Sequence, residues 1–171
     1  MSDDNELKTG TVTHIVGPAC EVDDGDRVYD AADRDRLTDS DTGQSNPLAV
    51  GDRVKFRVID EEKAKGVVEE LLPRQTKLSR AHPHDPRMEK IIVANVDRLL
   101  IVSSVKEPRL NLSLIDRYYI AALRGNLTPA LCINKTDLAD SEEDYSRAAR
   151  IYREQDMEVV TTSAKTGTGI D

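Results

Sequence analysis

Two short polar segments contain residue types suited to recognising a purine base. The first segment comprises Asn134, Lys135, Thr136 and Asp137, and it directly follows an apolar run. A carboxylate such as that of Asp137 can accept both the N1–H and the exocyclic N2–H of guanine in a charge-assisted bidentate contact. Adenine has an acceptor at N1 and would leave the carboxylate unsatisfied, which is costly. This chemistry predicts that Asp137 selects guanine.

The other residues of the first segment have supporting roles in this interpretation. Asn134 can tie its loop to a neighbouring loop and donate a hydrogen bond toward N7 of the base. Lys135 can lay its methylene stem across the face of the base, and Thr136 serves mainly as a spacer. Such a tetrad also occurs as an ordinary turn with a helix cap, which is the alternative interpretation.

The second segment comprises Ser163, Ala164 and Lys165, and it follows a β-branched run. The Ala164 backbone N–H is expected to point at O6 of guanine. Ser163 is expected to orient Asp137, and Lys165 to cover the other face of the base. A second loop of this type, at the same sheet edge as the first, favours a guanine site over a simple turn.

Residues 90–171 show the pattern of an α/β sheet that would bring the two segments together. Two near-continuous aliphatic runs in "KIIVANVDRLLIVSSV" indicate buried strands. A first helix is predicted from the spacing of Leu112, Ile115, Tyr119 and Leu123, with Gly125 as its C-cap. A second helix is predicted to begin at Ser141 as its N-cap. Parallel strands with right-handed crossovers place both polar segments beyond the carboxyl ends of strands, where ligands bind.

Residues 7–72 read instead as short strands separated by turns. Gly17 and Pro18 interrupt a β-branched run, and residues 33–47 form a long polar loop. In "VGDRVKFRVID", apolar residues alternate with charged ones, as in a half-buried strand. This spacing favours a five-stranded OB-type barrel, and an SH3-like barrel is the alternative.

A basic segment follows the predicted barrel. The formal net charge of the chain is −8. Residues 1–70 contain nine Lys and Arg residues and 18 Asp and Glu residues, whereas residues 71–110 contain eight Lys and Arg residues and four Asp and Glu residues. The basic residues concerned are Arg74, Lys77, Arg80, Arg87 and Lys90. Two prolines and a lack of periodicity predict a linker or extended loop, and a solvated connector is the simplest interpretation. The functional alternative is a strip that contacts nucleic-acid phosphates.

Several classes of site and compartment are not indicated. Cys20, Cys132 and the three histidines do not form a metal-ligand spacing, so reduced thiols buried in strands are expected. The polar N-terminal residues do not resemble a secretory signal, and no stretch has transmembrane length. An intracellular, soluble chain with no membrane partner is therefore expected.

A phosphate-cradling Gly-x-x-x-x-Gly-Lys-[Ser/Thr] motif, which ordinarily precedes a guanine-reading loop, does not occur in residues 1–133. A predicted barrel followed by "KIIVANVDRLLIVSSV", "LSLIDRYYIAAL", "LCINKTDL" and "TTSAKTGTGID" resembles the ribosome small subunit-dependent GTPase family, known as RsgA or YjeQ. In that family the motifs are circularly permuted, so that the base-reading loops precede the phosphate loop.

The resemblance implies an OB-type β-barrel over residues 1–80, followed by part of a circularly permuted P-loop GTPase-type α/β domain over residues 81–171. It implies a cytoplasmic, monomeric GTPase that uses GTP with Mg²⁺ and acts in maturation of the 30S ribosomal subunit. The barrel would contact 16S rRNA, with no DNA partner. The phosphate loop, the catalytic residues and a C-terminal Zn²⁺ domain are expected beyond residue 171, so the 171 residues alone are expected to be inactive.

Two other interpretations stay open from the sequence. The chain could be a non-catalytic OB-fold module that binds RNA or protein and carries a degenerate α/β domain. The second half could also be a generic α/β scaffold without nucleotide chemistry.

Overall fold

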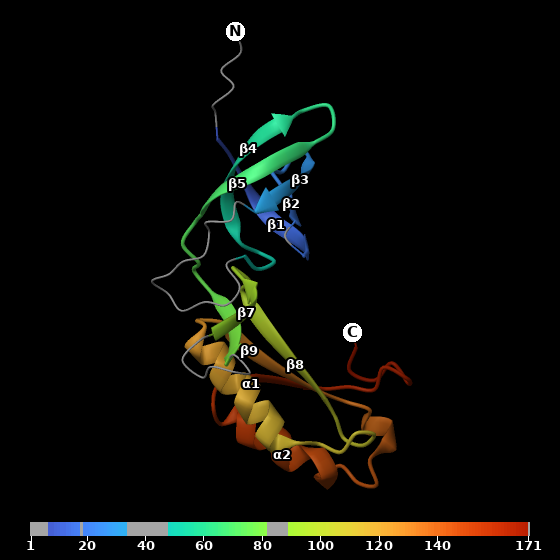
Figure 1. The fold of residues 1–171 in the computed structure, drawn as a ribbon. Helices are drawn as coiled ribbons and strands as arrows, with labels where there is room; N and C mark the ends of the chain where they lie inside the picture. Colours follow the sequence, from blue (N-terminus) through green and yellow to red (C-terminus); the bar gives the residue numbers. More distant parts are fainter. Residues whose placement is uncertain (1–6, 18, 34–47, 82–88, 171) are drawn as a thin grey trace. The chain divides into compact units, whose positions relative to one another are not determined.

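The computed structural model describes residues 7–17, 19–33, 48–81 and 89–170. Its contacts divide the chain into two compact units, Met1–Val96 and Asp97–Asp171. Each unit has its own buried apolar cluster, and the elements of both are labelled in Figure 1.

The first unit contains a closed five-stranded barrel. Its strands are β1 (Lys8–Val16), β2 (Ala19–Asp23), β3 (Val28–Asp33), β4 (Arg53–Asp60) and β5 (Lys65–Leu71). They close in the order β1-β2-β3-β5-β4, with β3 parallel to β5 and the other neighbours antiparallel. The alternation predicted for β4 is present, because Val54 and Phe56 are buried between more exposed basic residues. The OB-type barrel is confirmed, while the predicted loop of residues 33–47 lies almost wholly outside the described residues.

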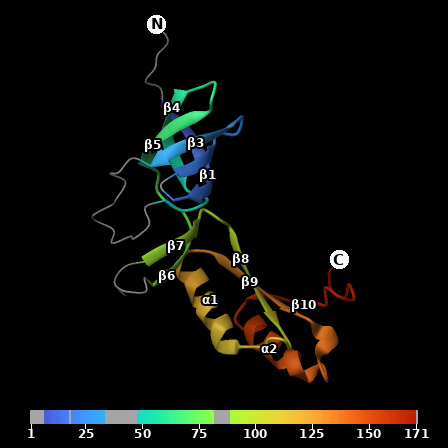
Figure 2. The same cartoon turned by 45° about the vertical axis from the view of Figure 1, so that its right-hand side comes forward.

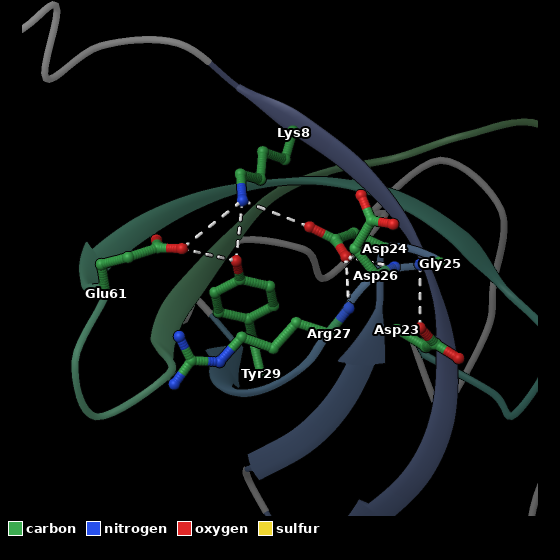
Figure 3. A network of polar contacts seen from close by, with 8 residues as sticks. All are labelled: Lys8, Asp23, Asp24, Gly25, Asp26, Arg27, Tyr29 and Glu61. Atoms are coloured by element: carbon green, nitrogen blue, oxygen red, sulfur yellow. Dashed lines mark hydrogen bonds and ion pairs between the residues drawn. The ribbon is translucent and has the colours of Figure 1, made fainter.

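Tyr29 and Phe56 provide the aromatic part of the barrel core, with ring centroids 5.2 Å apart. Figure 3 shows polar side chains gathered around the Tyr29 hydroxyl. Lys8 Nζ donates to this hydroxyl at 2.7 Å, and the hydroxyl donates to Glu61 Oε1 at 3.0 Å. The buried ring therefore keeps its polar atom hydrogen-bonded, as a buried tyrosine requires.

A two-stranded hairpin formed by β6 (Lys77–Ala81) and β7 (Glu89–Ala94) belongs to the same unit. The prediction of a linker over this basic segment is therefore wrong for residues 77–81. The first aliphatic run also pairs with β6 and does not join the parallel sheet. Both differences arise because the partner with which a short strand pairs, which local periodicity does not report, decides where that strand goes.

Backbone contacts fasten this hairpin to the barrel. Val50 forms a parallel bridge with Val93, and Asn95 Nδ2 donates to the Gly51 carbonyl at 2.9 Å. Gly51 has φ +88°, and a Cβ there would lie 2.0 Å from the Ala94 carbonyl oxygen, so only glycine fits this close approach. The division between the two compact units falls after Val96, and the division into domains of residues 1–80 and 81–171 stays a prediction.

The second unit is a three-stranded parallel sheet with two helices. Its elements are β8 (Arg98–Ser104), α1 (Leu112–Arg124), β9 (Thr128–Asn134), the 3-10 turn η1 (Thr136–Leu138), α2 (Glu143–Arg153) and β10 (Glu158–Thr161). The strand order is β10-β9-β8, with all neighbours parallel, as predicted. Figures 1 and 2 let the reader follow the alternation of strands and helices.

The two faces of this sheet differ. On one face Ile101, Leu131 and Val159 are buried in the cluster to which both helices contribute. On the other face lie Val102, Cys132 and Val160, which are paired in register across the three strands. Val102 is 62% exposed and Val160 is also exposed. One apolar face is thus open to solvent among the described residues.

The C-terminal end of α1 follows the prediction, whereas its buried face follows it only in part. Asn111 Oδ1 accepts from the Leu114 backbone N–H at 3.1 Å, and Gly125 is the C-cap. Ile115 is buried as predicted, but Leu112 and Leu123 are exposed. The three-stranded sheet contacts only the central stripe of the helix, so the apolar residues on its flanks remain uncovered.

The start of α2 differs from the prediction. Ser141 is not the N-cap; Glu142 occupies that position without a side-chain cap hydrogen bond. Asp144 Oδ2 instead accepts from the backbone N–H groups of Asp140 (2.8 Å) and Ser141 (3.3 Å). The carboxylate therefore satisfies donors that precede the helix, and favours its N-terminus electrostatically.

No helix among the described residues is long and apolar enough to span a membrane. In the same part of the chain, no group of three or more His, Cys, Asp or Glu side chains is placed to hold a metal ion. Cys20 is buried as a reduced thiol, whereas Cys132, also predicted to be buried, is only half-buried.

Candidate functional site

The two predicted base-reading segments meet at the carboxyl ends of β9 and β10. These strands pair in register through Val160 with Cys132 and Thr161 with Ile133. Asn134 ends β9, and Thr162 follows β10, with its N–H bonded to the Ile133 carbonyl at 2.9 Å. Parallel pairing thus brings together segments that are almost 30 residues apart, at the sheet edge where α/β proteins bind ligands.

Asp137 is held by the second segment. Ser163, which is 1% exposed, donates from Oγ to Asp137 Oδ1 at 2.6 Å. The Asp137 side chain is 15% exposed, and its Oδ2 lies 4.0 Å from Lys165 Nζ. Ser163 therefore orients the carboxylate, as expected, and Oδ2 accepts no hydrogen bond from the described residues.

Asn134 joins the two segments through its side-chain oxygen. Oδ1 accepts from the Ala164 backbone N–H at 3.1 Å and from Thr162 Oγ1 at 3.1 Å. The predicted tie between loops is present. The Ala164 N–H, expected to point at O6 of a base, is donated to Asn134 in this structure.

Thr136 was predicted to serve mainly as a spacer, but it also forms hydrogen bonds to the residue that follows β10. Its backbone N–H and its Oγ1 both donate to the Thr162 carbonyl, each at 3.1 Å. Thr162 is 4% exposed and was missed by sequence reasoning, although it forms hydrogen bonds to β9, through Cys132, Ile133 and Asn134, and to Thr136 of the first loop. A hydroxyl residue directly before Ser163 was the available signal, but its partners follow only from the pairing of β9 with β10.

The two lysines of the site are placed differently. Lys135 has a left-handed backbone (φ 62°), and its Nζ donates to the Glu107 carbonyl in the loop after β8. Its ammonium group is therefore tied to a neighbouring loop. Lys165 is largely exposed and free to move over a ligand.

The predicted basic strip is divided by the fold. Arg74 forms a bidentate pair with fully buried Asp52, through Nε and Nη2 at 2.7 Å each, and its side chain is only 9% exposed. Lys77 pairs with Glu89 at 2.6 Å. Arg80 and Lys90 lie directly opposite each other on β6 and β7. Arg87 lies outside the described residues.

These contacts leave a smaller cationic surface than predicted. Arg74 is tied to the barrel, so it is a structural residue in this fold. Arg80 and Lys90 have no carboxylate within ion-pair distance among the described residues, and like charges in directly opposed positions repel each other. Their juxtaposition on the hairpin is the part of the strip still suited to an anionic partner.

Comparison with known proteins decides the family. A model of the RsgA GTPase family matches residues 71–171. The chain belongs to the RsgA GTPase family. The small ribosomal subunit biogenesis GTPases RsgA from Chlorobaculum tepidum and Chlorobaculum parvum are 33% and 32% identical to it over 97% and 98% of its length. In each case the alignment covers 55% of the relative, so the chain spans about half the length of these RsgA proteins.

Solved structures agree with this assignment. YjeQ from Thermotoga maritima matches 96% of the chain and 55% of its own length, with a TM-score of 0.69 and 30% identity. YloQ, described as a circularly permuted GTPase, matches 96% of the chain and 54% of its own length, with a TM-score of 0.66. At 22% identity, YloQ supports the fold alone. The predicted combination of an OB-type barrel with a GTPase-type α/β unit is confirmed for this RsgA family member.

Proposed function

We propose that this chain carries the guanine-recognition part of a GTP-binding and GTP-hydrolysing protein that acts in maturation of the 30S ribosomal subunit in the cytoplasm. One observation carries the proposal: Asp137 is oriented by buried Ser163 at the carboxyl edge of the parallel sheet, with Oδ2 available to accept. The relatives named as small ribosomal subunit biogenesis GTPases support the same conclusion.

Base recognition would follow from the acceptor and donor groups at this edge. Asp137 would accept N1–H and N2–H of guanine, while Asn134 donates from Nδ2 to N7. The Ala164 N–H would turn from Asn134 Oδ1 toward O6, or be shared between the two oxygens. Lys165 would then cover one face of the base, and the stem of Lys135 the other.

Phosphate binding and hydrolysis need groups beyond those described. A GTPase gathers backbone N–H groups, a Lys and Mg²⁺ around the phosphates. The described residues offer no cluster suited to a cation. We propose that residues outside these 171 provide the phosphate loop, the Mg²⁺ ligands, the catalytic groups and any Zn²⁺ site.

The test of base choice compares Asp137→Asn with Asp140→Asn in the intact natural protein. An amide at position 137 can donate to the 2-oxygen of xanthine, so we expect relative affinity to shift from GTP toward XTP by about 1–3 kcal/mol. Asp140 is a suitable control because its side chain is exposed and its carboxylate pairs with Lys106 at 2.6 Å. Competition binding measures the shift, and an unchanged preference in Asp137→Asn would mean that Asp137 does not face the base.

We also propose that the β6–β7 hairpin contacts the phosphate backbone of 16S rRNA, through Arg80 and Lys90 and with help from Lys77 and Arg87. The sequence of the barrel is acidic overall, so this hairpin, with its opposed cations Arg80 and Lys90, is a surface of the first unit suited to an RNA backbone. Binding of RNA phosphates between Arg80 and Lys90 would relieve their mutual repulsion.

The test of this surface measures how the affinity of the intact protein for 30S subunits depends on salt. A plot of log K against log salt concentration has a slope set by the number of phosphate contacts. Arg80→Gln and Lys90→Gln should each reduce the magnitude of this slope by about one, which is the contribution of a single contact. Lys65→Gln is the control, since Lys65 is exposed on the barrel and pairs with Asp30 at 2.6 Å. Identical slopes in all variants would remove the hairpin from the RNA contact.

A further inference from the structure

The orientation of the Asn134 side-chain amide is set by its surroundings. The oxygen and nitrogen of an asparagine amide have nearly the same shape, so hydrogen bonds decide which one faces a ligand. Asn134 Oδ1 accepts from two donors, the Ala164 backbone N–H and Thr162 Oγ1. A backbone N–H can only donate, so Oδ1 must be the atom that faces Ala164. Nδ2 has no hydrogen-bond partner among the described residues and is left for a ligand.

The direction of the hydrogen bonds around Thr162 follows from the same reasoning. A hydroxyl has one proton to donate, and Thr162 Oγ1 gives it to Asn134 Oδ1, which cannot donate. Cys132 Sγ lies 3.3 Å from Thr162 Oγ1. Since the Thr162 proton is already used, the Cys132 thiol must be the donor in this contact. The result is a directed chain from Cys132 Sγ–H to Thr162 Oγ1–H to Asn134 Oδ1.

The position of Thr162 makes this chain well defined. Thr162 is almost fully buried, its N–H bonds to the Ile133 carbonyl at 2.9 Å, and its carbonyl accepts two hydrogen bonds from Thr136. Its backbone is therefore held on both sides. Cys132 projects from the open face of the sheet, in the row of Val102 and Val160, and so the chain runs from that face up to the base-reading edge.

The two donors to Asn134 Oδ1 are not equivalent once a base is present. The Ala164 N–H is the donor expected to serve O6 of guanine, so its bond to Asn134 weakens or is shared on binding. Thr162 then remains as the donor that holds Oδ1 away from the base. Without it, the amide could rotate and direct Oδ1 at N7, where two acceptors would repel each other.

We propose that Thr162 is a positioning residue that fixes the polarity of the Asn134 amide, with Cys132 supporting it, so that Nδ2 donates to N7 of the purine. This rests on the proposed guanine site. The contact to N7 is separate from base choice, because adenine also has an acceptor at N7. Asp137 discriminates at N1 and N2, while the chain from Cys132 through Thr162 to Asn134 governs N7.

The experiment measures two affinity ratios in the intact natural protein. The affinity for 7-deaza-GTP relative to that for GTP reports the N7 contact. The affinity for ITP relative to that for GTP reports the contact of Asp137 with N2–H. In the parent protein both analogues should bind more weakly than GTP, 7-deaza-GTP by roughly three- to tenfold for a neutral hydrogen bond and ITP by roughly ten- to a hundredfold for a hydrogen bond to the Asp137 carboxylate. In Thr162→Val, the 7-deaza-GTP discrimination should fall to within about twofold of unity, because a weakened Asn134 contact no longer distinguishes the analogue. The ITP discrimination should persist.

Two control variants sharpen the result. Thr162→Ser keeps the hydroxyl and should keep both ratios, whereas Cys132→Ala should reduce the 7-deaza-GTP discrimination less than Thr162→Val, since a thiol is a weak donor. Full 7-deaza-GTP discrimination in Thr162→Val would overturn the inference. If Thr162→Val lost its discrimination against ITP as much as its discrimination against 7-deaza-GTP, the inference would be overturned as well, because Thr162 would then support the whole site. A parent protein that does not distinguish ITP from GTP would contradict the proposed guanine site itself.

Discussion

The hydroxyl of Ser163 donates a 2.6 Å hydrogen bond to Oδ1 of Asp137, which joins the loop after β10 to the carboxylate of the loop after β9. Ser163 Oγ also accepts from the Thr166 backbone N–H at 3.2 Å, so its proton is directed at Asp137. The carboxylate is thereby held with Oδ2 outward. Base recognition in this fold consequently depends on a residue of the second loop as well as on Asp137.

Replacing this serine should weaken nucleotide binding. In the intact natural protein, Ser163→Ala removes a hydrogen bond to a charged group and frees the Asp137 carboxylate to rotate, so GTP affinity should fall by about 1.5–3 kcal/mol. Titration calorimetry measures the change. Ser113→Ala, at an exposed position of α1, is the matched control and should bind like the parent. An undiminished affinity in Ser163→Ala would show that this hydrogen bond does not orient the carboxylate in the bound state.

The Arg74–Asp52 pair should matter for stability more than for RNA binding. Arg74→Ala would leave the fully buried Asp52 carboxylate without its bidentate partner, which costs about 3–5 kcal/mol of unfolding free energy. Urea denaturation followed by circular dichroism tests this. Lys65→Ala removes one partner of the exposed pair with Asp30 and should cost less than about 1 kcal/mol. Equal effects of the two substitutions would argue against a buried pair at Asp52.

The barrel should lose stability in acid through Asp24. Burial raises the pKa of Asp24, but hydrogen bonds from the Arg27 and Asp26 backbone N–H groups and from Lys8 outweigh it and hold the pKa below its ordinary value of 3.8. A carboxyl with a lowered pKa stabilises the folded state above the unfolded-state pKa, and this contribution disappears as pH falls through the folded-state pKa. Unfolding free energy should therefore decline as pH drops below about 3.8.

The contribution of Asp24 can be isolated by substitution. Asp24→Asn retains an oxygen for the turn shown in Figure 3 but cannot titrate, so its stability should depend less steeply on pH in this range. Denaturation midpoints measured across the acid range would show the difference. Asp26→Asn, at an exposed neighbouring position, should follow the parent. A parallel decline in Asp24→Asn and the parent would assign the acid sensitivity to other groups.

The 171 residues by themselves should bind Mg-GTP weakly and not hydrolyse it. Most affinity for a nucleoside triphosphate comes from groups around the phosphates, whereas the groups assembled at the edge of β9 and β10 address the base. Titration calorimetry and a phosphate-release assay are the measurements. Micromolar affinity, or turnover above a blank without protein, would reveal phosphate-binding residues within this chain.

The open face of the parallel sheet should make the second unit prone to local opening and self-association. Val102 and Val160 are exposed on this face, and strand edges that lack neighbours tend to pair with other chains. We expect low amide protection over residues 97–170 and a sedimentation coefficient that rises with concentration. Val102→Thr should reduce the self-association. Strong protection throughout, with a monomer at all concentrations, would show that the three strands are self-sufficient.

The types and order of the elements could be predicted from sequence alone, because they depend on local periodicity and on a few polar residues. The alternation in β4, the C-cap at Gly125, and the succession of strands and helices after residue 97 are all encoded within short windows. The same is true of the guanine interpretation, since the acceptor groups suited to N1–H and N2–H follow from residue type.

Tertiary structure decided which of these groups meet. Arg74 looked like one more cation of a basic strip, yet pairing with buried Asp52 makes it structural. Thr162 had only a weak local signal of importance, and the parallel register of β9 and β10 is what places its hydroxyl beside Asn134 and Cys132. Hydrogen bonds between residues almost 30 positions apart depend on how distant strands pair, which no local pattern of residue types specifies.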